Sequence, residues 1–266
     1  MKKMKFIIVP VVLIQICALF CFAQKASDYG KITISPMDSG VKISGNEIFI
    51  EPKSEDTTYI ISGHFDGQII CKTKNTVLKL NNAYLENNLG KAAIYAEAKT
   101  EISTSKGSTN YVVSSGNPTS KTAAIHSKKN LVLGGSGTLY VKNESGHAVK
   151  ADDIKMKGSG VFYLTASKKC SAINCESFTV EKDKTFSCYL RDSKNGIKAD
   201  GTIRIASGIF YFENNETAMK TDTKEDDKKA GISPIEHGIF ITGGKINYKN
   251  NKALYETEKG KYKSYL

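Results

Sequence analysis

The chain has 266 residues and a formal net charge of +11, with 38 lysines and arginines against 27 aspartates and glutamates. Basic and acidic residues are interleaved and form no dense basic cluster, which argues against a nucleic-acid-binding protein. After the first residues no apolar run is long enough to predict a membrane span.

The first 23 residues are predicted to be a secretory signal peptide. Lysines precede an uncharged apolar run over residues 6–23, which is short for a membrane helix and ends in the small residue Ala23. This order is typical of a cleaved leader. We expect cleavage after Ala23 and a secreted or periplasmic protein; lipidation of Cys17 or Cys21 is the less favoured alternative.

The mature chain would keep a net charge of +8, because three lysines leave with the leader. A basic protein outside the cytoplasm favours anionic partners such as acidic glycans, lipid head groups or cell-wall polymers. Four cysteines remain, and their strand-like surroundings favour buried thiols over disulfides. They are Cys71, Cys170, Cys175 and Cys188.

Residues 24–56 are predicted to form entry strands that cover the N-terminal end of the fold, since "KITIS" and "NEIFIEP" alternate apolar and polar residues. A repeat follows over residues 57–250. Similar phrases such as "TAAIHSK", "HAVKADD" and "NGIKADG" recur, and their central apolar residues are separated by 31, 24, 24, 24 and 22 positions. These central residues are Ile94, Ile125, Val149, Ile173, Ile197 and Met219.

Each repeat continues with two alternating segments, such as "TIRIASG" and "IFYFEN". Period-2 alternation rich in β-branched and aromatic residues predicts strands. Three short strands in about 24 residues predict one coil of a parallel β-helix, stacked at about 4.8 Å per coil. The fold class is therefore all-β; a β-sandwich is the runner-up, but it does not explain the fixed period.

Alternation within "GIKAD" sends Ile197 and Ala199 inward and Lys198 and Asp200 outward. The same rule predicts an inward column of small residues: Ala96, Ser127, Ala151, Cys175, Ala199 and Thr221. One outward column contains Tyr95, His126, Lys150, Asn174, Lys198 and Lys220, and a second contains Glu97, Lys128, Asp152, Glu176, Asp200 and Asp222.

The acidic column has two interpretations that the sequence leaves open. Neighbouring lysines can balance it as a solvated face laced by salt bridges. Alternatively, carboxylates of adjacent coils can bind Ca²⁺, which takes about six to eight oxygen ligands. The candidate metal ligands are Asp152, Asp153, Glu176, Asp192, Asn195, Asp200 and Asp222.

The remaining segments have simpler interpretations. Residues 221–231, "TDTKEDDKKAG", are predicted to be a solvated loop, in which Asp226 and Asp227 are further candidate ligands. Residues 251–266 are predicted to be a polar C-terminal tail with at most one short cap.

The chain resembles the bacterial carbohydrate-binding, calcium-binding right-handed β-helix family, which is related in shape to pectate lyases. The resemblance rests on "YIISGHFDGQIICKT" (residues 59–73), "VLKLNNAYLENNLGKAAIYAE" (77–97) and "NGIKADGTIRIASG" (195–208), and it spans most of the mature chain. It implies Ca²⁺ bound between coils and affinity for polysaccharides, including cellulose and polygalacturonate, without implying catalysis.

On this resemblance the lysine column would meet acidic sugars, while carboxylates and Ca²⁺ bridge to uronates. The candidate carbohydrate-binding residues are Lys150, Lys198, Lys220 and Tyr95. The chain contains no tryptophan, so a flat sugar platform would depend on tyrosines such as Tyr95, Tyr163 or Tyr211, for which packing between coils is the favoured role.

Two other functions stay open. A polysaccharide lyase acting on uronate polymers would need Ca²⁺ and a base, for which the candidates are Arg191, Lys198 and Arg204. A structural or adhesion protein of the cell envelope would use the solenoid only as a rod. A calcium requirement for folding without glycan binding would favour this second alternative.

Overall fold

The structure is a computed structural model that describes residues 26–116, 122–222, 237–258 and 261–264. Its regular elements are strands, apart from the three-residue 3-10 turn η2 (Ala26–Asp28). The prediction of an all-β protein is therefore confirmed. The leader, with Cys17, Cys21 and Ala23, lies outside the described residues, as do Asp226 and Asp227.

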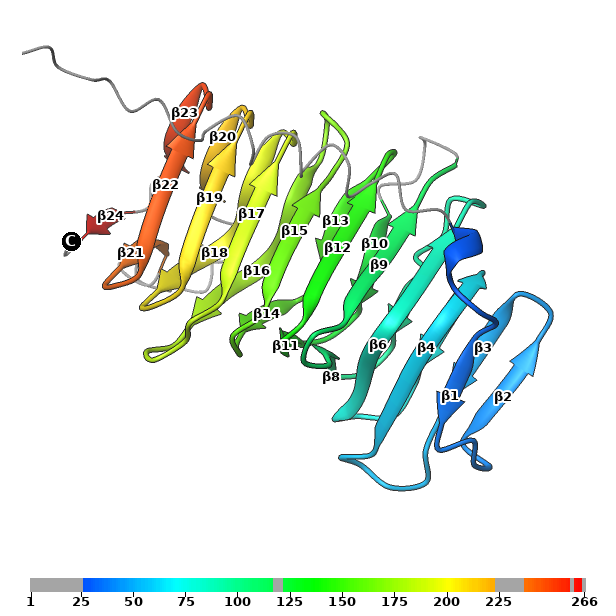
Figure 1. Ribbon diagram of the computed structural model, residues 1–266. Coiled ribbons are helices and arrows are strands. Elements are labelled where there is room, and N and C mark those ends of the chain that lie inside the picture. The colour runs from blue at the N-terminus through cyan, green and yellow to red at the C-terminus, as the bar shows by residue number, and fades with distance from the viewer. Residues whose placement is uncertain (1–25, 117–121, 223–236, 259–260, 265–266) are drawn as a thin grey trace, which may run out of the picture.

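Strands one coil apart pair in parallel and form three rows along the molecule (Figure 1). The first row contains β5 (Gln68–Cys71), β7 (Ile94–Ala96), β10 (Ala123–Ser127), β13 (His147–Lys150), the first halves of β16 (Ser171–Val180) and β18 (Asn195–Ile205), β20 (Thr217–Asp222) and β23 (Ala253–Glu258). The second row contains the first half of β6 (Thr76–Asn87), β8 (Thr100–Thr104), β11 (Leu131–Gly135), β14 (Asp153–Met156), the second halves of β16 and β18, β21 (Gly238–Ile241) and β24 (Lys261–Ser264). The third row contains the second half of β6, β9 (Thr109–Ser114), β12 (Thr138–Asn143), β15 (Val161–Thr165), β17 (Ser187–Arg191), β19 (Ile209–Glu213) and β22 (Lys245–Lys249).

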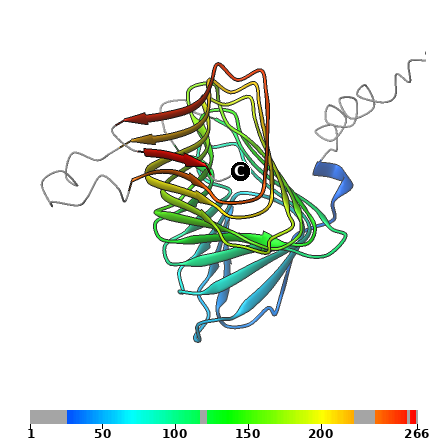
Figure 2. The same ribbon diagram turned by 90° about the vertical axis from the view of Figure 1, so that its left-hand side faces the viewer.

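The predicted alignment of the repeats agrees with the strand register. Ile125 lies opposite Ile94 on one side and Val149 on the other, and Ile197 lies opposite Ile173 and Met219. These central residues are at most 1% exposed, and the predicted column of small residues is buried beside them. Viewed along the stack, successive coils lie over one another, so equivalent residues meet in columns (Figure 2).

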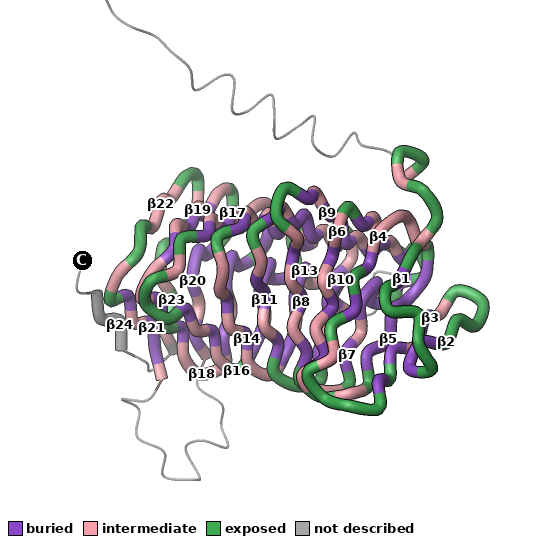
Figure 3. The backbone as a smooth tube through the Cα atoms, turned by 60° about the horizontal axis from the view of Figure 1, so that its bottom comes forward, coloured by how far each residue is buried: buried purple, intermediate pink, exposed green. Residues whose placement is uncertain are grey.

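The core is one continuous cluster inside the coils, with buried and partly exposed residues alternating along the strands (Figure 3). Phenylalanines fill its C-terminal half: the ring centroids of Phe186 and Phe210 are 5.6 Å apart, and those of Phe178 and Phe210 are 6.1 Å apart. No single coil could bury this set, so stability comes from stacking neighbours.

The four cysteines among the described residues are unpaired and buried, as the sequence favoured. Burial raises the pKa of the Cys71 thiol, and it raises the pKa of the Cys175 thiol to a greater extent. A buried protonated thiol is a poor nucleophile, so Cys71 and Cys175 act as small apolar residues.

Two glycines make the tight corner between the second and third rows. Gly135 and Gly158 have φ of 102° and 90°, a region that side chains rarely adopt. A Cβ on Gly158 would lie 2.2 Å from the carbonyl oxygen of Gly135, and one on Gly135 would lie 2.2 Å from the backbone nitrogen of Thr104. Successive coils therefore approach too closely here for any side chain.

Antiparallel strands occupy the N-terminal end of the stack (Figure 1). β1 (Thr33–Ser35) pairs with β4 (Thr58–Asp66), while β2 (Val41–Ser44) pairs with β3 (Glu47–Ile50). β3 and β4 then pair in parallel with β5 and β6 and so begin the rows. The described part of the entry segment therefore forms strands.

The C-terminal end differs from the prediction of a polar tail over residues 251–266. β23 pairs in parallel with β20, and β24 pairs with β21, so two of the rows extend into this segment. Leu254 is 43% exposed while Tyr255 packs against the core, and the many charged residues hide this alternation in the sequence. Within the described residues no helix is long and apolar enough to cross a membrane.

Candidate functional site

The acidic column lies on the outer face of the first row, where lysines are paired with it. Lys198 Nζ lies 2.8 Å from Asp222 Oδ2 and 3.5 Å from Asp200 Oδ1. Lys220 Nζ lies 2.5 Å from Glu256 Oε1 and 3.5 Å from Asp222 Oδ1. These contacts fit the lysine-balanced interpretation of the column.

The ion pairs also set the charge states. Burial opposes the charge on Lys198, but the hydrogen bond and charge of Asp222 outweigh it and raise the pKa of this lysine. The hydrogen bond to Glu256 raises the pKa of Lys220 and lowers that of Glu256 itself. Lys198, Lys220 and Glu256 are therefore held in their charged forms at neutral pH.

The other candidate metal ligands in this part of the fold point to separate partners. Asp152 forms a 3.9 Å ion pair with Lys129, and Asp153 accepts a 2.5 Å hydrogen bond from Ser177 Oγ. Glu176 is exposed, at a point where the pairing of β16 with β18 shifts in register. The acidic column therefore passes an irregularity in the strand pairing at Glu176.

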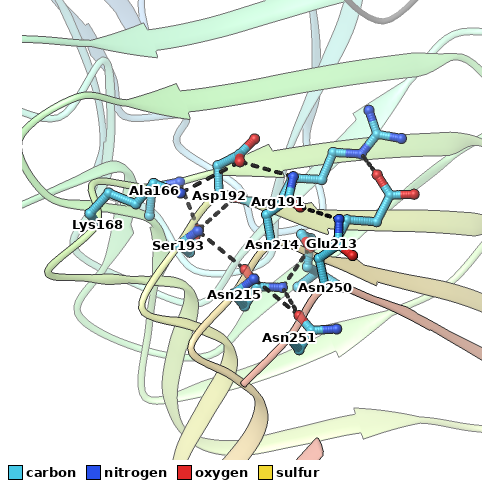
Figure 4. Close-up of polar contacts among 11 residues, drawn as sticks. Ala166, Lys168, Arg191, Asp192, Ser193, Glu213, Asn214, Asn215, Asn250 and Asn251 are labelled. Carbon is cyan, nitrogen blue, oxygen red and sulfur yellow. Dashed lines mark hydrogen bonds and ion pairs between the residues drawn. The ribbon is translucent and has the colours of Figure 1, made fainter. Parts of the chain in front are cut away.

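Asp192 (Figure 4) and Asn195 lie elsewhere, where the chain turns from the third row into the first. Asp192 Oδ1 accepts a 3.2 Å hydrogen bond from Asn214 Nδ2 and lies 3.5 Å from Lys168 Nζ. Asn195 is 4% exposed and donates to Ser171 Oγ over 3.1 Å. Among the described residues no group of three or more histidine, cysteine, aspartate or glutamate side chains is placed to hold a metal ion.

Tyr95, His126 and Lys150 lie in register on the first row, as predicted. The ring of Tyr95 is not an open platform, because Lys128 Nζ lies 5.5 Å from its centroid and His126 meets it edge-on at 5.5 Å. A hollow of about 170 Å³ beside them is also lined by Gln68. The roles predicted for Lys150, Lys198, Lys220 and Tyr95 in sugar binding stay predictions.

A larger hollow, of about 420 Å³, crosses the outer face of the second row. Its volume falls in the range of about 300–1,000 Å³ that is usual for ligand sites. The hollow crosses successive coils, since its lining comes from β11, β14 and β16 and from the residues that precede β8 and β11. It is lined by Lys99, Asn130, Leu131, Val132, Asp153, Ile154, Lys155, Lys157, Ser177 and Thr179.

Two lysines of this hollow are held in place by ion pairs. Lys157 Nζ lies 2.7 Å from Glu101 Oε2 and reaches it across Gly134, where a Cβ would lie 3.0 Å from Lys157 Cγ. Lys155 Nζ lies 2.5 Å from Glu181 Oε1. Within the described chain Lys99 makes no ion pair, so its ammonium group is available to a ligand.

Sequence reasoning named only Asp153 in this hollow. The other polar residues sit at outward positions of aligned second-row strands, such as Lys155 beside Ile154 and Met156. That alternation was a usable signal. It lies in the second segment of each repeat, outside the first phrase that carries the acidic and lysine columns.

The outer face of the third row carries six stacked tyrosines, a set that we call the tyrosine ladder. Successive ring centroids lie 5.4, 4.9, 4.6, 4.6 and 4.3 Å apart, and the last four pairs are within 14° of parallel. The packing role favoured for Tyr163 and Tyr211 thus agrees with the ring contacts. The ladder consists of Tyr84, Tyr111, Tyr140, Tyr163, Tyr189 and Tyr211.

Residues 44–183, more than half of the chain, match the family described as carbohydrate-binding domain-containing proteins. The chain belongs to this family. The match includes every residue that lines the second-row hollow and ends before β17. No curated protein matches the chain.

Among solved structures, the polysaccharide lyase-like protein from C. thermocellum, solved as a gadolinium derivative, has a similar fold. The TM-score is 0.53 at 17% identity, and the alignment covers 84% of this chain and 92% of the other. At this identity the likeness concerns the fold alone.

The basic residues considered for a lyase do not converge in this carbohydrate-binding chain. Arg191 lies on the third row, Lys198 on the first and Arg204 on the second. Arg191 pairs with Glu213, 2.9 Å from Nε to Oε2, and Arg204 lies 4.6 Å from the ring centroid of Phe240. Each therefore has a local partner on a different face.

Proposed function

We propose that this chain is an exported, non-catalytic protein that binds polysaccharide in the second-row hollow. The observation that carries the proposal is the hollow itself: it crosses successive coils inside the segment matched to the carbohydrate-binding family. A linear polymer can follow such a surface from coil to coil. The predicted leader supports export.

The lining favours an acidic polysaccharide. Asn130, Ser177 and Thr179 offer hydrogen-bonding groups suited to sugar hydroxyls, while Lys99 offers a cation that makes no ion pair within the described ranges. The net charge of +8 expected for the mature chain adds a long-range attraction for polyanions. Uronate polymers such as polygalacturonate combine both features.

We also propose a handedness for the winding of the strands. The three rows are taken as the faces of a right-handed parallel β-helix, which is supported by parallel pairing at one-coil intervals and by the likeness to the polysaccharide lyase-like protein. A crystal structure in which the coils wind in the opposite sense would overturn this assignment.

Binding of polygalacturonate by the mature protein tests the site. Lys99→Ala is expected to weaken binding about three- to tenfold, with less salt dependence, because one charge-assisted contact is lost. Lys42→Ala is the matched control, since it removes an exposed lysine from β2 outside the hollow. Equal effects of the two variants would show that general charge, and not the hollow, attracts the polymer.

Calcium binding is a separate proposal that calorimetric titration decides. The pairs of Asp200 and Asp222 with Lys198 compete with a cation for these carboxylates, so we expect a dissociation constant of about 10⁻⁴–10⁻³ M. Asp200→Ala should weaken it further. Micromolar binding with a raised melting temperature would contradict the ion-pair account, and an absence of saturable heat would remove calcium from the proposal.

A further inference from the structure

The tyrosine ladder ends abruptly at Tyr211. In the next strand, β22, the residue opposite Tyr211 is Asn247. Asn247 Nδ2 donates to the carbonyl oxygen of Phe210 over 3.1 Å, which holds this short side chain against the backbone. Within the described chain no further ring stacks on Tyr211, so one of its faces looks along the stack over Asn247.

The ring of Tyr211 is held firmly in this orientation. Its other face stacks on Tyr189 at 4.3 Å and an interplanar angle of 4°. Tyr189 is in turn stacked on Tyr163 and lies 4.8 Å from the guanidinium carbon of Arg191, which is itself paired with Glu213. A ligand that stacks on Tyr211 therefore meets a preorganised ring and need not order it.

Burial and neighbouring groups also affect the ionisation of Tyr189, a member of the ladder. Burial is the largest of the effects that raise the pKa of Tyr189 to about 12, and Tyr163, Tyr211 and a hydrogen bond with Tyr211 raise it further. The Tyr189 hydroxyl, which lies next to Tyr211 in the ladder, therefore presents no negative charge to an anionic ligand at physiological pH.

Two cations flank the open ring face. Lys245 and Lys249 lie two residues before and after Asn247 on β22, so their side chains project from the same face of the row. Both are exposed, and in the part of the chain that the structure describes neither forms an ion pair. An apolar ring face beside two unpaired ammonium groups is complementary to a ligand with one apolar face and a negative charge.

We propose that Tyr211, Lys245 and Lys249 form a second glycan subsite, which takes an acidic pyranose of a polysaccharide. The C–H face of the sugar stacks on the ring of Tyr211, and its carboxylate pairs with Lys245 or Lys249. The inference rests on the proposed polysaccharide-binding function. It adds a contact on a different row, beyond the segment that matches the family.

The absence of tryptophan from the chain permits a direct test. Tyr211→Trp introduces a single fluorophore at the open ring face, and titration with trigalacturonate is expected to change its emission. Tyr189→Trp is the matched control, because both faces of that ring are covered by ladder neighbours. Equal responses, or no response at Tyr211→Trp, would overturn the subsite.

Affinity provides a second readout that does not depend on the reporter. Tyr211→Leu is expected to weaken trigalacturonate binding roughly tenfold, whereas Tyr211→Phe should keep it, since the ring face is retained. Removing both Lys245 and Lys249 should abolish the preference for trigalacturonate over a neutral cello-oligosaccharide. Thermal unfolding of each variant checks the fold.

The outcomes separate this inference from the function on which it rests. If the wild-type protein binds no glycan, the proposed function fails and the subsite fails with it. If Lys99→Ala weakens polygalacturonate binding while Tyr211→Leu leaves trigalacturonate binding unchanged, the function stands and only the subsite is overturned.

Discussion

Phe210→Ala is expected to lower the free energy of unfolding by about 3–5 kcal/mol, because it removes a large buried ring and leaves a cavity. Phe210 is fully buried on β19. Its ring centroid lies 5.6 Å from that of Phe186 and 6.1 Å from that of Phe178 on β16, so it joins the third row to the second. The hollow is lined by the outer face of that same second row. Urea unfolding followed by circular dichroism would measure the loss.

Leu89→Ala is the control for this prediction. Leu89 is 67% exposed, and its truncation should change stability by no more than about 0.5 kcal/mol. A loss below about 1 kcal/mol for Phe210→Ala would mean that the stack collapses around the cavity or that its coils unfold independently, contrary to one continuous core.

Asn215→Ala is expected to cost about 2–3 kcal/mol, because it leaves buried backbone groups without partners. Asn215 is 2% exposed at the corner after β19 (Figure 4). Its Nδ2 donates to the carbonyl oxygen of Leu190 over 3.0 Å and to Asn251 Oδ1 over 3.0 Å, while its Oδ1 accepts from the backbone N–H of Ser193 over 3.2 Å. One side chain thus joins three successive coils.

Asn214→Gly is the matched control at the adjacent position. Asn214 is exposed and has φ of 57°, a conformation that glycine adopts without strain. It loses only surface hydrogen bonds to Asp192 and Asn250, so thermal unfolding should shift far less than for Asn215→Ala. Equal shifts would show that the corner is stabilised by its exposed contacts and not by the buried asparagine.

Much of the fold could be predicted because, in a stacked repeat, residues that are one repeat length apart in the sequence become neighbours in space. The pairing of Ile197 with Ile173 and Met219 follows from the repeat alone. The C-terminal strand β23 was missed because charged residues obscure its alternation, although it continues the same row. The leader and the loop that contains Asp226 lie outside the described residues, so their predictions stand untested.

The site was less predictable. The sequence identified an acidic column and a lysine column, but it left open whether they bind calcium or each other. Lys198 contacts both Asp200 and Asp222, because its side chain is long enough to span the distance between adjacent coils. Similarly, the tyrosine ladder needs the strands of the third row in register before its rings can stack.

What the sequence by itself determined is the period, the alternation and therefore the columns, because these depend only on backbone geometry. What only the tertiary structure decided is which side chains in those columns are already satisfied. Lys157 reaches Glu101 across Gly134, whereas Lys99 makes no ion pair among the described residues. Tyr189 has both ring faces covered and Tyr211 only one. Such differences arise from reach and packing between coils, which no local pattern in the chain encodes.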